Sequence, residues 1–216
     1  MLLAGIEEAG RGPVIGPLVM CGVLVNEKDS EKLRSLGAKD SKLLTPDTRL
    51  ILYDQIINMI KAFEIVIIPP EKIDQALNSE TSNLNKLEGT TSAKIINKLS
   101  PDKAILDCPS NNPPAYAEFV KSHLDNKDIE LIAEHKADEN YPVVSAASIL
   151  AKVTRDKEID KLKKKFKVDF GSGYPADERT QEFLKKNYNK YPFFRKTWIS
   201  YKNVVEGKKQ KRLGDF

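Results

Sequence analysis

The chain has 216 residues, of which 40% are hydrophobic and 31% are charged, and its formal net charge is +4. This length fits one domain of ordinary size, or one domain with a smaller addition. No stretch approaches the roughly 20 apolar residues of a membrane helix, and the first residues do not read as a secretory signal. We therefore expect a cytoplasmic protein without membrane contacts. Its two cysteines, Cys21 and Cys108, lack metal-site spacing and are expected to be reduced thiols.

The charge is distributed unevenly along the chain. Residues 1–150 contain 16 Lys and Arg against 22 Asp and Glu, whereas residues 151–216 contain 19 against 9. The acidic part holds the candidate chemistry, and the basic part could bind a polyanion such as nucleic acid. A merely solvated lysine-rich face explains the segment 161–167 equally well, but it explains the whole C-terminal third less well.

Apolar runs and helical patterns follow one another in chain order. Residues 2–6 and 18–25 read as strands joined by a glycine-rich turn, and further apolar runs lie at 64–69, 103–108 and 129–135. Helical spacing predicts helices at 46–63, 83–99, 114–124, 142–166 and 177–188. This order predicts an α/β fold, with helices on the faces of a mixed sheet and a helical C-terminal part.

The turn after the first strand reads GIEEAGRGPVIGP over residues 5–17. It lacks the Lys-Ser/Thr pair of a phosphate-binding P-loop, and its glycine spacing does not match a dinucleotide fingerprint. The neighbouring Glu7 and Glu8 would also repel a phosphate. A divalent cation between carboxylates and phosphate removes that conflict. Both glutamates can serve one site only if the strand is ending, which Ala9 and Gly10 permit; two exposed glutamates at a strand end are the open alternative.

Two further carboxylates stand at predicted element ends. Asp107 closes a hydrophobic run, and Asp138 precedes the helix that begins near Pro142. Each also has an ordinary structural interpretation. Asp107 could be a turn residue before a proline, and Asp138 could be an acid at a helix N-terminus. Together with the glutamate pair they suit two divalent ions about 4 Å apart, as in phosphoryl-transferring nucleases. The prediction is cleavage that depends strictly on Mg²⁺ or Mn²⁺.

Five segments of the chain together resemble ribonuclease HII. The opening motif Gly5–Pro13 is one of them, and the match is collinear from about residue 4 to 180. The other segments are Asp40–Lys42, Ile105–Asp107, His135–Asp138 leading into Ser145–Lys152, and Gly171–Pro175. The resemblance implies a ribonuclease H-like fold with a five-stranded mixed sheet. It also implies endonucleolytic cleavage of RNA in RNA–DNA hybrids and 5′ of single ribonucleotides in duplex DNA, leaving 3′-OH and 5′-phosphate ends.

The resemblance also assigns residue roles. It implies that the metal ligands and catalytic residues are Glu7, Glu8, Asp107 and Asp138. It places Gly10, Arg11 and Gly12 against the ribose 2′-OH and Tyr174 on the neighbouring sugar, and Lys42 and Lys152 are candidate phosphate contacts. Without the pattern, Tyr174 would be an ordinary turn aromatic and both lysines ordinary surface residues. One residue departs from the family: its first carboxylate is normally aspartate, and here it is Glu7.

The last residues match the pattern Q-x-x-L-x-x-F at Gln210, Leu213 and Phe216. This pattern resembles the peptide by which replication proteins bind the sliding clamp, and helical spacing would put Leu213 and Phe216 on one side. The alternative is a basic tail that matches by chance. We expect a monomer with a catalytic domain at 1–165, a helical substrate-binding part at 166–206 and a clamp-binding tail at 207–216.

Two other functions remain open at this stage. One is a nuclease of the same fold that acts on structured DNA, although a turn that contacts the 2′-OH argues against it. The other is a clamp-tethered hybrid-binding protein whose catalysis is impaired by Glu7, although the remaining three carboxylates argue against complete loss. His123 and His135 form no convincing acid–base pair, and neither is assigned a catalytic role.

Overall fold

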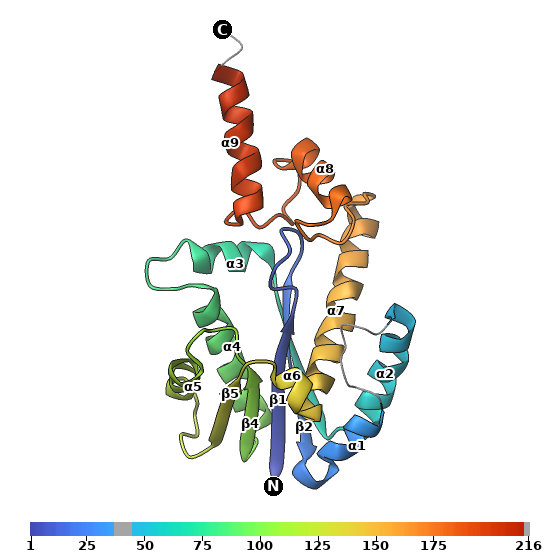
Figure 1. Ribbon diagram of the computed structural model, residues 1–216, viewed down its shortest axis with the longest axis vertical. Coiled ribbons are helices and arrows are strands. Elements are labelled where there is room, and N and C mark those ends of the chain that lie inside the picture. Colours follow the sequence, from blue (N-terminus) through green and yellow to red (C-terminus); the bar gives the residue numbers. More distant parts are fainter. Residues whose placement is uncertain (37–44, 214–216) are drawn as a thin grey trace. The chain divides into compact units, whose positions relative to one another are not determined.

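A computed structural model describes residues 1–36 and 45–213 of the chain (Figure 1). The chain forms two compact units. Unit 1 contains Met1–Ala9, Val19–Ile67 and Leu84–Thr154, and unit 2 contains Gly10–Leu18, Ile68–Asn83 and Arg155–Phe216. Within the described ranges, none of the helices has the length and apolar character that crossing a membrane requires.

Unit 1 is built around a mixed sheet. Its strands are β1 (Leu2–Ala9), β2 (Leu18–Asn26), β3 (Ala62–Ile68), β4 (Lys103–Asp107) and β5 (Glu130–Glu134). The order is β3-β2-β1-β4-β5, with β1 antiparallel to β2 and parallel to β4, and with β4 parallel to β5. The predicted five-stranded mixed sheet is confirmed. The continuous apolar run of β2 is buried along almost its whole length, as expected for a strand covered on both faces.

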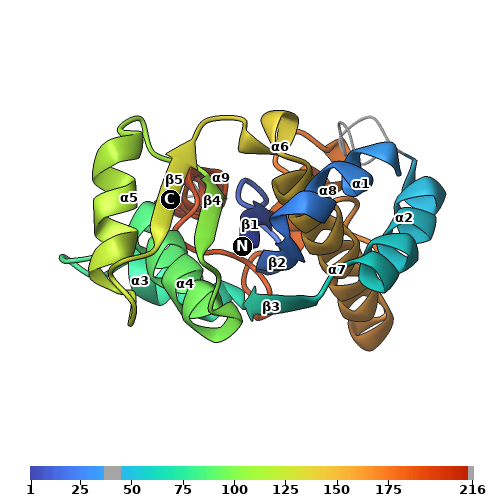
Figure 2. The same cartoon turned by 90° about the horizontal axis from the view of Figure 1, so that it is seen from below.

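Helices cover both faces of this sheet. On one face lie α2 (Pro46–Met59) and the first part of α7 (Pro142–Phe166), and on the other lie α4 (Leu84–Leu99) and α5 (Pro113–Ser122) (Figure 2). Short helical segments complete unit 1: η1 (Glu27–Asp29), α1 (Ser30–Ser35) and α6 (Ala137–Asn140). At Gly5 a Cβ atom would lie 2.5 Å from the backbone of Val143 and Val144, so β1 and the start of α7 meet with no side chain between them.

Unit 2 has a core of its own that is rich in aromatic rings. Its helices are α3 (Pro70–Leu77), the second part of α7, α8 (Glu178–Asn187) and α9 (Ile199–Leu213). Val14 and Ile15 from the glycine-rich turn pack in this core with Phe170 and Phe194. The turn that begins at Gly10 is therefore anchored in the core of unit 2.

Besides the short segments η1, α1 and α6, which were not predicted, the elements depart from the sequence-based expectations in three places. The helix predicted to reach Phe63 ends at Met59, because Lys61 N–H bonds to the carbonyl of Leu24 in β2 (2.9 Å) and the chain joins the sheet. No helix is predicted at Pro70–Leu77, although α3 begins at a proline, which a first helical position tolerates. The segment from residue 207, predicted as a tail, continues α9 through Leu213.

Candidate active site

Glu7 and Glu8 are both part of the regular ladder of β1. They pair with Cys21 and Met20 of β2, and the strand ends one residue later at Ala9. Side chains alternate along a strand, so Glu7 lies on the face that Gly5 presents to α7, and Glu8 lies on the opposite face. The strand thus ends where the sequence permitted, but its regular pairing separates the two carboxylates by face. Glu7 is buried, with 8% of its surface exposed.

Asp107 lies on the same face as Glu7. β4 runs parallel to β1 with Ile105 opposite Gly5, so Asp107, two residues further on, shares the orientation of the Glu7 side chain. Asp107 Oδ1 accepts a hydrogen bond from the backbone N–H of Ala137 (2.8 Å). This bond ties the end of β4 to the first residue of α6, and the next residue of that helix is Asp138.

The carboxylates concentrate negative charge at this end of the sheet. Burial raises the pKa of the Cys108 thiol, and the charges of Asp107 and Glu8 raise it further. Burial also raises the pKa of Cys21, with Glu7 contributing. The charges of Glu8 and Asp107 therefore both act on Cys108, although the Glu8 side chain extends from the other face of β1.

The donor set fits a hard divalent cation, because carboxylate oxygens are the ligands that Mg²⁺ and Mn²⁺ favour. Among the described residues, however, no group of three or more His, Cys, Asp or Glu side chains is arranged to hold a metal ion. The elements bring Glu7, Asp107 and Asp138 to one end of the sheet, but their side chains do not form a closed metal site. Convergence of all four carboxylates stays a prediction.

Residues predicted to contact nucleic acid meet in unit 2. The backbone N–H groups of Val14 and Ile15 both bond to the carbonyl of Gly173 (2.9 and 3.3 Å), which joins the glycine-rich turn to the turn carrying Tyr174. A Cβ atom at Gly12 would lie 3.7 Å from the Tyr174 ring. Tyr174 as a residue is 37% exposed. Gly12 and Tyr174 are thus close neighbours with surface available for a ligand.

For the other residues predicted to bind nucleic acid or the clamp, the structure gives little beyond the helix in which they lie. Lys152 lies in α7, half-buried. Gln210 and Leu213 belong to the backbone of α9. Lys42 and Phe216 lie outside the described residues.

Two buried arginines near the turn were not predicted. Arg155 has its guanidinium 5.0 Å from the centre of the Tyr174 ring, and burial lowers its pKa. A Cβ atom at Gly10 would lie 2.4 Å from the Arg155 side chain, so this position requires glycine. Arg195 is fully buried beside the turn. Its sequence signal is an arginine within an aromatic run, YPFFRKTW at 191–198, whereas Arg155 has no distinguishing signal.

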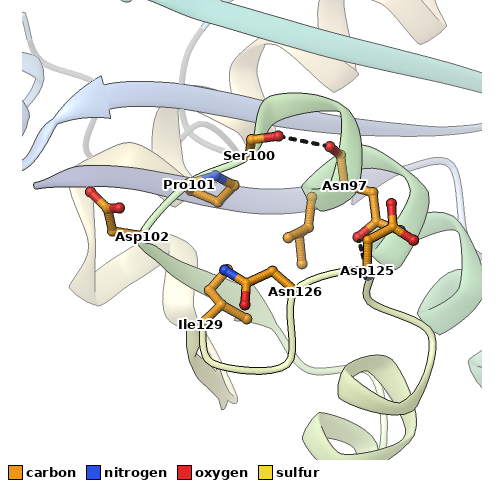
Figure 3. Close-up of a pocket in the computed structure, with 8 residues that line it drawn as sticks. Asn97, Ser100, Pro101, Asp102, Asp125, Asn126 and Ile129 are labelled. Carbon is orange, nitrogen blue, oxygen red and sulfur yellow. Dashed lines mark hydrogen bonds between the residues drawn. The ribbon is translucent and has the colours of Figure 1, made fainter.

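A cavity of about 200 Å³ lies at the other end of the sheet (Figure 3). Asp102 and Ile129, which directly precede β4 and β5, line it together with Asn97 and Asp125. Asp102 and Asp125 stand on opposite sides of it in Figure 3. The backbone N–H of Asp125 bonds to Asn97 Oδ1 (3.0 Å). This cavity is separate from the carboxylates, which lie at the C-terminal ends of β1 and β4.

Comparisons with known proteins agree on one family. The family model described as Ribonuclease HII matches residues 4–204. The chain is 45% identical over 218 residues to Ribonuclease HII of Pyrococcus furiosus, covering 98% of this chain and 95% of the relative. The solved ribonuclease H2 of Pyrococcus horikoshii OT3 is similar with a TM-score of 0.87 and 41% identity, over 96% of this chain and 98% of that one. A PCNA:RNase HII complex from Archaeoglobus fulgidus contains a chain with a TM-score of 0.84 and 40% identity, covering 94% and 96%.

Proposed function

The chain belongs to the ribonuclease HII family, and from that premise we propose that it cuts duplex DNA on the 5′ side of single embedded ribonucleotides. It is an endoribonuclease of the ribonuclease H type, which hydrolyses the RNA strand of RNA–DNA hybrids. The finer proposal includes 3′-OH and 5′-phosphate products. The observation that most supports the proposed nuclease activity is the arrangement of carboxylates at one end of the sheet. The register of β1 and β4 and the bond from Ala137 N–H to Asp107 bring them there.

Enzymes of this family depend on metal ions, and we propose two Mg²⁺ or Mn²⁺ ions per site. Glu7, Asp107 and Asp138 would hold them, with Glu8 completing the set from the opposite face of β1. Such ions supply an activated water and neutralise the charge that develops on the leaving 3′-oxygen. The bond from Ala137 N–H fixes one oxygen of Asp107 against the first residue of α6, next to Asp138.

Recognition of the ribonucleotide is proposed for the glycine-rich turn and Tyr174. The 2′-OH distinguishes RNA from DNA at a given position, and a turn without bulky side chains lets backbone groups reach it. Gly10, Arg11 and Gly12 would contact this hydroxyl. The Tyr174 ring would pack on the neighbouring deoxyribose, where an additional hydroxyl would be unfavourable. Lys152 and the lysine-rich residues 166–206 would contact phosphates.

The sliding clamp is the proposed protein partner, bound through Gln210, Leu213 and Phe216. The relative from Archaeoglobus fulgidus was solved in a complex with PCNA, which supports this partner for the family. The backbone of α9 is helical through Leu213. A helical approach to a hydrophobic pocket with anchors three residues apart is a known mode of peptide recognition.

The deciding experiment compares two labelled duplexes that differ only in one 2′-OH. We expect the wild type to cut the ribonucleotide-containing duplex with Mg²⁺ or Mn²⁺, to leave the all-DNA duplex intact, and to stop in EDTA. The variant Asp107→Asn retains an oxygen for the Ala137 N–H but loses the charge that binds cations, and should be inactive with an unchanged Tm. Equal cutting of both duplexes, or cutting in EDTA, would refute the proposed function.

A further inference from the structure

Arg195 is a fully buried arginine whose guanidinium is bound to the glycine-rich turn. Its Nε donates to the carbonyl of Gly16 (2.9 Å), Nη1 to that of Arg11 (3.0 Å) and Nη2 to that of Gly10 (2.6 Å). A buried cation is costly unless its donors are satisfied. Three carbonyls of one short turn therefore provide much of what makes burial of this side chain possible.

Trp198 completes this arrangement on the same chain segment. Its indole Nε1 donates to the carbonyl of Gly12 (3.0 Å), and the centre of its ring lies 4.8 Å from the guanidinium carbon of Arg195. The backbone N–H of Arg195 bonds to the carbonyl of Val14 (2.9 Å). The segment 195–198 thus holds the carbonyls of residues 10, 11, 12, 14 and 16.

This segment is itself held in place by α3. Asp74 accepts hydrogen bonds from the backbone N–H groups of Lys196 (2.8 Å) and Thr197 (3.0 Å) and from the Thr197 hydroxyl (2.6 Å). These two residues separate Arg195 from Trp198 in the chain. The donors that face the turn are therefore attached to a fixed loop.

The direction of the carbonyls determines the direction of the amides. In a planar trans peptide, the C=O of one residue and the N–H of the next point in opposite directions. Because the carbonyls of Gly10 and Arg11 point at Arg195, the N–H groups of Arg11 and Gly12 point away from it. Under the proposed function, this face of the turn, opposite segment 195–198, is the one that would donate to an acceptor such as a ribose hydroxyl oxygen.

We propose that Arg195 and Trp198 are positioning residues that hold the turn at residues 10–16 in the one shape that discriminates a ribose from a deoxyribose. This role rests on the proposed function, since the turn is the element assigned to the 2′-OH. Arginine suits it because its planar fork presents several donors at fixed angles, whereas lysine presents a single flexible charge. Phenylalanine at 198 would keep a ring beside Arg195 but lose the donor to Gly12.

The test compares Arg195→Lys and Trp198→Phe with the matched control Tyr201→Phe. Tyr201 also belongs to the core of unit 2 and donates its hydroxyl to the carbonyl of Tyr188 (3.0 Å), away from the turn. Under the proposed function EDTA prevents cleavage, so binding is measured there. The ratio of the binding affinities for a ribonucleotide-containing and an all-DNA duplex should fall about 10-fold or more in the first two variants and change less than about 2-fold in the control. Hydrogen exchange at Val14, Ile15 and Gly16 should become faster only in the first two.

The outcomes separate this inference from the proposed function. A wild type without preference for the ribonucleotide refutes the proposed function, and hydrogen exchange then still decides whether segment 195–198 fixes the turn. The inference would be overturned if Trp198→Phe changed neither the preference for the ribonucleotide-containing duplex nor the hydrogen exchange of the turn. It would also be overturned if Tyr201→Phe lowered that preference as much as the first two variants do. If Arg195→Lys does not fold, Trp198→Phe carries the test, with its Tm compared against that of the control.

Discussion

Position 7 carries glutamate where the family motif has aspartate, which lengthens the side chain by one methylene. A misplacement of about 1 Å at a reacting centre can cost on the order of 100-fold in rate. We expect Glu7→Asp to raise the Mg²⁺-supported turnover number on a ribonucleotide-containing duplex, measured at saturating substrate. Glu7→Gln, which removes the charge, serves as the control and should be inactive. Lower activity of the aspartate variant would mean that the surroundings of residue 7 have adapted to glutamate.

Gly10 combines a positive φ of 85° with a crowded position. A Cβ atom there would lie 2.4 Å from Arg155 and 2.8 Å from the carbonyl oxygen of Pro17. Gly10→Ala should therefore lower the free energy of unfolding by about 1–3 kcal/mol and abolish discrimination of the ribonucleotide. Gly207→Ala is the matched control, since a Cβ atom there has no neighbour within 4 Å. It should raise stability by about 0.5–1 kcal/mol, and urea denaturation measures both changes.

The sequence singled out the four carboxylates as candidates because Glu7, Glu8 and Asp107 stand at the ends of apolar strands and Asp138 precedes a helix; their shared role stays a prediction. Arg155 and Arg195 could not be singled out in this way. Arg195 donates to carbonyls of residues about 180 positions earlier in the chain, and no local pattern reveals such a bond. The closeness of Gly12 and Tyr174 was likewise expected only from the family resemblance.

At the scale of elements, α8 and the turn before it depend on one side chain. Asp177 caps α8 by accepting from the N–H of Arg179 (2.9 Å), while its other oxygen accepts from the N–H of Ser172 (2.7 Å). The hydrogen bond from Ser172 is the main cause that lowers the pKa of Asp177. The same carboxylate therefore connects the start of α8 to the turn that carries Tyr174.

A lowered pKa in the folded state stabilises the protein above the ordinary Asp pKa of about 3.9, and this contribution disappears as the pH falls through the folded-state value. Asp177→Asn retains one accepting oxygen but has no charge to titrate. We expect the variant to have a lower Tm than the wild type at pH 7, with a difference that shrinks as the pH approaches 3. A difference that stays constant over this range would show that the charge of Asp177 does not matter for stability.

Strands were easier to predict than helices in this chain. Each long apolar run became a strand, because β2 and β4 are buried in the interior of the sheet. Helix ends were set by tertiary contacts instead, as at Lys61, where pairing with β2 ends α2 early. α3 escaped prediction because the dipeptide Pro69–Pro70 also fits a loop. The part of α9 after residue 206 was predicted as a tail because a lysine-rich segment fits a tail as well as a helix.

For the molecule as a whole, binding of the clamp and cleavage should be separable. Deleting residues 210–216 should abolish binding to the sliding clamp, measured by calorimetry, and leave cleavage of short duplexes unchanged. The double variant Leu213→Ala with Phe216→Ala tests the same contact without shortening the chain. Undiminished clamp affinity in both variants would contradict the assignment of this peptide.

The central place of β1 has a consequence for how the protein acquires its activity. β1 precedes β2 directly in the chain and can form a hairpin with it early in synthesis, but its other edge pairs with β4, which lies about 100 residues later. Contacts between such distant segments slow folding, because a long loop must close before they form. Glu7 and Asp107 thus come onto adjacent strands late in synthesis, and a nascent chain that stops before residue 107 lacks Asp107 and Asp138, two of the four proposed metal ligands.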